Sequence, residues 1–134
     1  MDSGDLASLG FGSWHAFYPA AADELLKHAP REYGVYAIRR STPYQRAHGS
    51  SDLLYVGSAT NASGGLNMRL RQYFRVGHDQ ATNKRILALV TGSDQYQVAW
   101  RITATKGEAL AGEADFLERY KREHGERPPQ NRRG

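Results

Sequence analysis

The chain has 134 residues, no cysteine and a formal net charge of +4, and 40% of its residues are hydrophobic. This length is typical of one domain with its own core, and the lack of cysteine excludes disulfides and thiolate metal sites. No apolar run approaches the length of a membrane span and the first residues are acidic, so we expect a soluble, cytoplasmic protein.

The first half of the chain predicts one helix and two strands. We expect residues 1–12 to be frayed, and residues 19–30 to form a short helix because proline stands at both ends of that stretch. Residues 33–40 (YGVYAIRR) carry strand-forming side chains on both faces and predict the first strand. The polar, turn-rich stretch 41–52 would connect it, as a long hairpin, to a second strand at residues 53–57.

The next part of the chain predicts two helices and a strand. Apolar residues at helical spacing indicate a helix over residues 66–74, after a polar loop at 58–65, and TNKRILALV indicates a shorter helix from residue 82. Residues 95–103 (QYQVAWRIT) alternate apolar with polar side chains, which is the pattern of a half-buried strand.

The last predicted element is a helix that runs to about residue 120. Thr105 and Glu108 stand three positions apart at its start, the spacing of a capping box. The order helix, strand, strand, helix, helix, strand, helix indicates a small α+β domain with helices packed on the sheet. We expect one domain over residues 1–134, in which residues 1–30 form an N-terminal extension with a short helix.

Glu113 does not fit the apolar pattern of the last helix. It lies in the middle of the stripe that this helix would bury, where a carboxylate loses water at a cost of several kcal/mol unless it holds a cation. The alternative is that Glu113 sits on the rim, where it reaches solvent or pairs with an arginine. Helical spacing alone does not decide between the two.

Arg69 raises the same question on the helix over residues 66–74. Leu66 precedes it by three positions and Tyr73 follows it by four, which puts the guanidinium on the apolar side. Alternatively, its stem packs while its head reaches outward to water. Other basic residues are by default a solvated face. They are Arg71, Arg75, Lys84 and Arg85, and near the end Arg127, Arg132 and Arg133.

Two strand tyrosines, Tyr36 and Tyr55, complete a set of side chains that suits the binding and hydrolysis of a phosphodiester. A carboxylate can hold a hard divalent cation, an arginine can clamp phosphate oxygens, and a phenol can position or deprotonate water. Other chemistries fit less well, because the histidines show no metal-ligand spacing and no glycine-rich phosphate loop precedes a helix.

Five motifs in order resemble those of the GIY-YIG nuclease family. GVY ends at Tyr36, YVG begins at Tyr55, and GLNMRLRQYF contains Arg69; EALAGE ends at Glu113, and PPQN ends at Asn131. The resemblance covers residues 34–131. The sequence most resembles the excision-repair branch of the family, in which a tyrosine follows the arginine by four positions, as Tyr73 follows Arg69 here.

The resemblance implies a metal-dependent endonuclease that hydrolyses DNA phosphodiester bonds. The expected fold is a three-stranded antiparallel sheet flanked by helices, with one metal site on its face. Glu113 would bind Mg²⁺ or Mn²⁺, Arg69 would stabilise charge on the phosphoryl oxygens, and Tyr73 would support the site. Either Tyr36 or Tyr55 would be the general base. A free phenol has a pKa of about 10, so the base would need positive charge nearby.

The expected substrate contacts are Gly57, Ser58, Arg71, Arg75 and Asn131. Asn131 would either bind the substrate or hold the C-terminal loop. The expected partner is DNA, in repair or recombination, with branched and single-stranded forms as candidates.

Departures from the family pattern keep other interpretations open. Restriction-enzyme members use a histidine at the position of Tyr73, and His78 lies too far along to take that role. Ser58 stands where many excision-repair members carry a lysine. A nucleic-acid-binding module with weak or lost catalysis is therefore the main alternative, and a protein-interaction domain that reuses the fold is a third.

Overall fold

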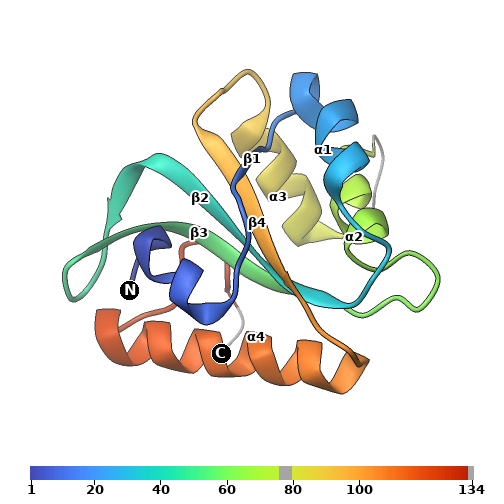
Figure 1. Ribbon diagram of the computed structural model, residues 1–134. Helices are drawn as coiled ribbons and strands as arrows, with labels where there is room; N and C mark the ends of the chain where they lie inside the picture. Colours follow the sequence, from blue (N-terminus) through green and yellow to red (C-terminus); the bar gives the residue numbers. More distant parts are fainter. Residues whose placement is uncertain (76–79, 133–134) are drawn as a thin grey trace.

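The chain folds into a four-stranded antiparallel sheet with helices on both faces (Figure 1). The structure is a computed structural model, and it describes residues 1–75 and 80–132. The strand order is β1-β4-β2-β3. The strands are β1 (His15–Ala16), β2 (Gly34–Gln45), β3 (Ser50–Ala59) and β4 (Tyr96–Ile102); the helices are α1 (Ala22–His28), α2 (Gly65–Tyr73), α3 (Ala81–Val90) and α4 (Lys106–His124).

The α+β class is as predicted, but the expectation of three strands is wrong. The additional strand, β1, pairs His15 with Val98 and Ala16 with Gln97, and so covers the edge of β4. Two residues are too few to show the alternation that identifies a strand in a sequence. The other three strands were all expected.

The expectation that residues 1–12 are frayed is also wrong. Two 3₁₀ turns, Ser3–Asp5 and Ala7–Leu9, fold this stretch back onto the sheet. Leu6 is 1% exposed and Phe11 is 6% exposed. Such short turns have no helical period, so the burial of their apolar side chains is decided by tertiary packing.

The sheet separates two apolar cores. On one face, α4 and the N-terminal turns cover the first core, which includes Phe116 and Tyr120. On the other face, α1, α2 and α3 cover the second, which includes Tyr36 and Tyr73 (Figure 1). Side chains alternate across a strand, so β2 supplies both cores.

The two strands of the hairpin and the last helix are longer than predicted, and the turn of the hairpin is shorter. Strands β2 and β3 extend through most of the polar stretch 41–52, and only residues 46–49 form the turn, in which Gly49 has a φ of 73°. Helix α4 continues to His124 and ends at Gly125, whose φ of 76° is typical of a helix C-cap. Within the two described ranges, no helix is long and apolar enough to cross a bilayer.

The predicted capping box is half formed. The Thr105 hydroxyl accepts a hydrogen bond from the backbone N–H of Glu108. The Glu108 carboxylate in turn accepts from the backbone N–H of Ala104, one residue before the expected donor.

Candidate active site

Arg69 is held by two buried tyrosines. Its Nε donates to the Tyr36 hydroxyl at 3.1 Å and its Nη2 to the Tyr73 hydroxyl at 3.4 Å. The two hydroxyls are 2.7 Å apart and hydrogen-bonded to each other. The guanidinium also lies 4.9 Å from the centre of the Tyr73 ring. The helical spacing of α2 thus does place Arg69 against buried side chains, and the phenols fix its orientation.

Burial changes the acidity of these phenols. Both rings are fully buried, and this raises the pKa of Tyr36 and of Tyr73, although the charge of Arg69 acts in the opposite direction. Both therefore stay protonated at neutral pH. Of the two tyrosines considered as a general base, Tyr36 is in the less suitable environment.

Gly57 makes room for the tyrosines. It is paired with Tyr36 across the β2–β3 ladder. A Cβ added at Gly57 would lie 2.5 Å from the Tyr36 hydroxyl oxygen and 2.8 Å from Cε2 of Tyr55. Gly57 is itself buried, so the structure gives it a spatial role and does not expose it to a substrate.

Tyr55 lies closer to solvent. It is half-buried, and its ring centre is 6.1 Å from that of Tyr36. It lines a pocket of about 300 Å³ together with Glu113. The other candidate base is therefore open to the same space as the predicted metal ligand.

Glu113 projects from α4 beside β3. The preceding residue, Gly112, lets the helix approach closely, because a Cβ there would lie 2.9 Å from Cγ2 of Val35. Glu113 is half-buried, and its burial raises the pKa of the carboxyl, while hydrogen bonding from Ser58 and the charges of Arg69 and Arg127 partly offset this. No ion pair joins Glu113 to a basic side chain in residues 1–75 and 80–132.

These residues meet along the edge of the sheet. Tyr55 belongs to the core beneath α2 and α3, whereas α4 with Glu113 packs on the opposite face. Strand β3 lies at the end of the strand order, so groups from both faces converge around it. A second pocket of about 250 Å³ holds Ser58 and Arg69. The two pockets therefore lie along the edge of the sheet at β3, and each is lined by part of the expected site.

Asn131 fastens the C-terminal segment to this edge. Its Oδ1 accepts from the backbone N–H of Val56 at 2.9 Å, and its Nδ2 donates to the Val56 carbonyl at 2.8 Å. The backbone N–H of Gln130 donates to the Leu54 carbonyl at 3.0 Å. Of the two roles expected for Asn131, the geometry favours holding the loop, which brackets Tyr55 on both sides.

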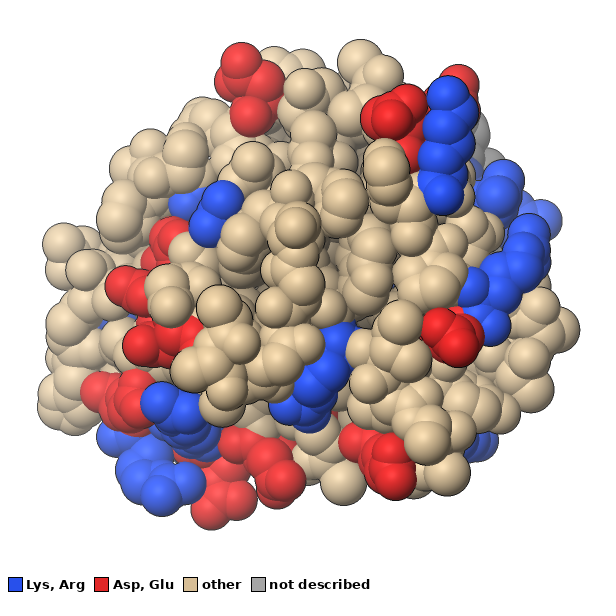
Figure 2. Space-filling model, viewed as in Figure 1, with Lys and Arg blue, Asp and Glu red and all other residues tan. Residues whose placement is uncertain are grey.

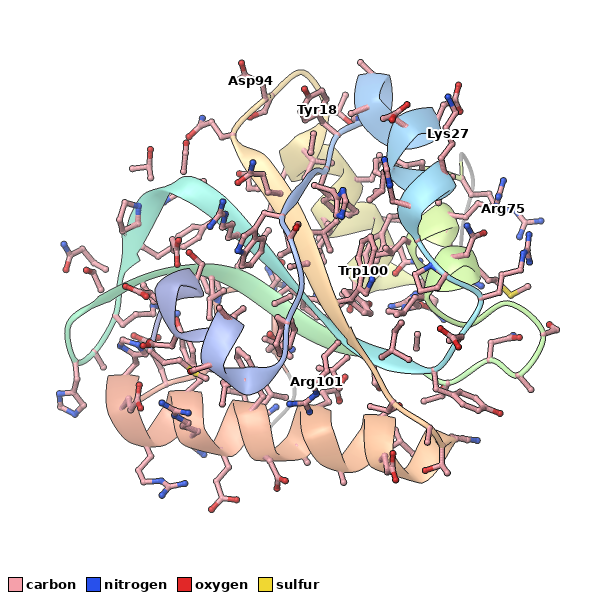
Figure 3. The ribbon with its side chains drawn as sticks, in the orientation of Figure 1. Tyr18, Lys27, Arg75, Asp94, Trp100 and Arg101 are labelled. Carbon is pink, nitrogen blue, oxygen red and sulfur yellow. The ribbon has the colours of Figure 1, made fainter. Side chains whose placement is uncertain are left out.

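Arg71 and Arg75 lie away from the two pockets. Arg71 is exposed and donates to Oδ1 of Asn67 at 3.2 Å. Arg75 is exposed and points outward, away from the sheet (Figure 3). Neither lines the pocket beside Glu113 or the one beside Arg69. His78 and Arg133 fall outside the described residues.

Several residues that line the two pockets were not expected to be site residues from the sequence. Thr82 and Arg85 of α3 line the pocket beside Glu113, with Arg127 and Gln130. Gln72 accepts from Arg69 Nη1 at 3.2 Å. Thr82 and Arg85 are three positions apart on one helical face, but their partners come from the far end of the chain, which local spacing does not show.

The donor set fits a hard divalent cation that keeps most of its waters. Glu113 supplies one carboxylate beside an open pocket, and Mg²⁺ is commonly bound by one or two carboxylates together with water and substrate phosphate. Among the residues that the structure describes, no group of three or more histidine, cysteine, aspartate or glutamate side chains is placed to hold a metal. A closed zinc-type site is therefore not present in that part of the chain.

Comparison of the sequence finds similarity to UvrABC system protein C. UvrABC system protein C of Trichormus variabilis is 30% identical over 103 residues, which are 76% of this chain and 14% of that protein. The corresponding protein of Gloeobacter violaceus is 31% identical over 103 residues, 77% of this chain and 14% of the relative. The chain thus matches only about 14% of the length of these curated relatives. No family model matches the chain.

Comparison of the structure finds solved structures with the same fold. The GIY-YIG N-terminal endonuclease domain of UvrC from Thermotoga maritima, bound to its catalytic divalent cation magnesium, is 20% identical with a TM-score of 0.51. The match covers 82% of this chain and 94% of that domain. A point mutant of that domain, also bound to its catalytic divalent cation, gives a TM-score of 0.53 at 20% identity and covers 84% of this chain and 96% of the domain. The resemblance inferred from the five motifs is confirmed.

Proposed function

The chain has the fold of the GIY-YIG nucleases and resembles that family in sequence, and from this we propose that it is a divalent-metal-dependent endonuclease acting on DNA. The observation that carries the proposal is the convergence of Tyr55, Arg69 and Glu113 at the edge of β3. These three residues come from different elements. They supply a phenol, a guanidinium and a carboxylate, which are groups that can serve phosphodiester hydrolysis.

Glu113 is the residue that would hold Mg²⁺ or Mn²⁺. The ion would supply positive charge where negative charge develops on the departing oxygen. The carboxylate is half-buried and without an ion pair among the described residues, so a cation would compensate for its lost hydration.

Arg69 would stabilise the phosphoryl oxygens. Its Nε and Nη2 are directed at two neutral phenols, which set the orientation of the guanidinium before a substrate arrives. Preorganised donors of this kind contribute on the order of 3 kcal/mol to the transition state. Tyr36 and Tyr73 act as positioning residues in this proposal, because burial keeps them protonated.

Tyr55 would accept the proton of the attacking water. It is the tyrosine that shares a pocket with Glu113. Residues 1–134 would fold as one domain. The protein would act in DNA repair or recombination in the cytoplasm. The similarity to UvrABC system protein C supports the repair role.

The alternative is a nucleic-acid-binding module of the same fold with weak catalysis. It rests on Ser58, which stands at the lysine position of many excision-repair members and supplies no positive charge there. Such a module would bind DNA in a salt-dependent manner without cutting it.

Cleavage assays separate these functions. Supercoiled plasmid, branched DNA and single strands are incubated with the protein and Mg²⁺ or Mn²⁺, with EDTA as one control. Glu113→Gln removes the carboxylate, and Glu118→Gln is its matched control on α4, since the Glu118 side chain is 76% exposed. The nuclease proposal expects cleavage that EDTA and Glu113→Gln abolish and Glu118→Gln preserves. Salt-sensitive binding without cleavage of any substrate would favour the alternative.

A further inference from the structure

The pocket beside Glu113 is rich in arginine. Arg85 from α3 and Arg127 and Arg132 from the C-terminal segment line it, and Glu113 is the one acidic side chain in its lining. By contrast, acidic and basic side chains are interspersed over α4 on the face shown in Figure 2. A pocket with three arginines against one carboxylate attracts anions, and a cation at Glu113 would strengthen that attraction.

Arg85 is held in place without being neutralised. Its Nε donates to Oε1 of Gln130 at 3.0 Å and its Nη2 to the hydroxyl of Thr82 at 3.3 Å. Both acceptors are uncharged, and no ion pair involves Arg85 in the described part of the chain. A guanidinium has five N–H donors, so this half-buried side chain keeps donors for a ligand.

Arg127 stands on an anchored segment. Its carbonyl accepts from Nη1 of Arg46 at 2.8 Å, and within a few residues Gln130 and Asn131 are hydrogen-bonded to β3. The segment therefore presents Arg127 to the pocket at low entropic cost.

We propose that Arg85 and Arg127 bind a backbone phosphate of DNA next to the one that is cleaved. This inference rests on the proposed function, because it places the cleaved phosphate between Arg69 and Glu113. A guanidinium presents parallel N–H donors that match two oxygens of one phosphate. A contact of this kind is with the backbone and carries no sequence preference.

The test measures binding and not cleavage. Fluorescence anisotropy follows a labelled single strand and a labelled branched duplex in EDTA over a series of salt concentrations. The variants are Arg85→Gln and Arg127→Gln, and the matched control is Arg122→Gln, whose side chain is 72% exposed on α4. Thermal melting of each variant verifies that it is folded, and Arg85→Lys retains the charge without the fork.

We expect Arg85→Gln and Arg127→Gln each to weaken binding about tenfold, as for the loss of a charged hydrogen bond. Each should also reduce the slope of log K against log salt by about 0.7 to 0.9, whereas Arg122→Gln should change neither quantity. Unchanged affinity and slope in folded Arg85→Gln and Arg127→Gln would overturn the inference, even if the parent cleaves DNA. A parent that does not cleave, with the arginine effects intact, would refute the catalytic proposal and leave the phosphate contact standing. Absence of salt-dependent binding by the parent would overturn the phosphate contact, whether or not the parent cleaves DNA.

Discussion

At the scale of single residues, the site depends on small side chains as much as on charged ones. Gly57 faces the ring of Tyr36 across the ladder, and Gly112 allows α4 to approach Val35. The sequence placed Gly57 in a motif, but it could not show that the glycine serves the neighbouring strand. That relation depends on strand register, which is a long-range property.

Gly57→Ala is expected to destabilise the protein by about 1 to 3 kcal/mol, because the added Cβ would overlap the buried Tyr36 hydroxyl. Urea unfolding measures this change. Gly107→Ala is the control, since a Cβ there would have its nearest neighbour at 3.9 Å. A Gly57→Ala protein as stable as the parent would contradict the packing described here.

The pH dependence of the cleavage rate distinguishes the two candidate bases, Tyr55 and Tyr36. Tyr55→Phe should lower the single-turnover cleavage rate by about 10² to 10⁴, the usual contribution of a general base. Tyr36→Phe removes an acceptor from Arg69 and a partner from Tyr73, so it should lower the rate while leaving the pH dependence unchanged. A pH dependence that disappears in Tyr36→Phe would instead identify Tyr36 as the base.

At the scale of elements, long periodic segments were predictable and short ones were not. Helix α4 and strand β4 follow clear patterns in the sequence, and both were predicted near their observed positions. Strand β1 and the N-terminal 3₁₀ turns were missed, because two or three residues show no period and their burial depends on the sheet.

The N-terminal turns should contribute to stability. Leu6 is 1% exposed in the core beneath α4, so Leu6→Ala is expected to cost about 2 to 5 kcal/mol. Leu110→Ala is the matched control, because Leu110 is 47% exposed on α4 and its loss should cost less than about 0.5 kcal/mol. Equal denaturation midpoints for the two variants would support the frayed N-terminus that the sequence suggested.

The C-terminal segment should hold the edge of β3 in place. Asn131→Ala removes both side-chain hydrogen bonds to Val56, so amide exchange at Val56 should become faster. The amide of Ala37, in the neighbouring strand β2, provides the internal control and should be unaffected. Unchanged exchange at Val56 would show that the segment is held by other contacts.

At the scale of the whole molecule, the candidate site is assembled from distant segments around the edge strand β3. The motifs gave the identities of Tyr36, Arg69 and Glu113 in the sequence, and the fold brings them near β3. The pairing of Arg85 with Gln130 joins residues 45 positions apart. No local pattern predicts it, because it exists only once α3 and the C-terminal segment flank the same pocket.

The grouping of basic side chains also depends on the fold. The sequence showed basic residues near positions 69–85 and at the end of the chain, but it did not show which of them face a common space. In the structure Arg71 and Arg75 are exposed and line neither pocket, whereas Arg85 and Arg127 line the pocket beside Glu113. Net charge alone therefore says little about where an anion binds.

The most direct test of the central claim is single-turnover cleavage of supercoiled plasmid by the parent and by Arg69→Lys, with Mg²⁺ titrated from zero. We expect no cleavage without the ion and cleavage by the parent that rises with Mg²⁺ to saturation. The rate should be at least tenfold lower for Arg69→Lys, which keeps the charge but loses the planar guanidinium held by the phenols. Cleavage that is independent of Mg²⁺, or equal in the two proteins, would contradict the central claim.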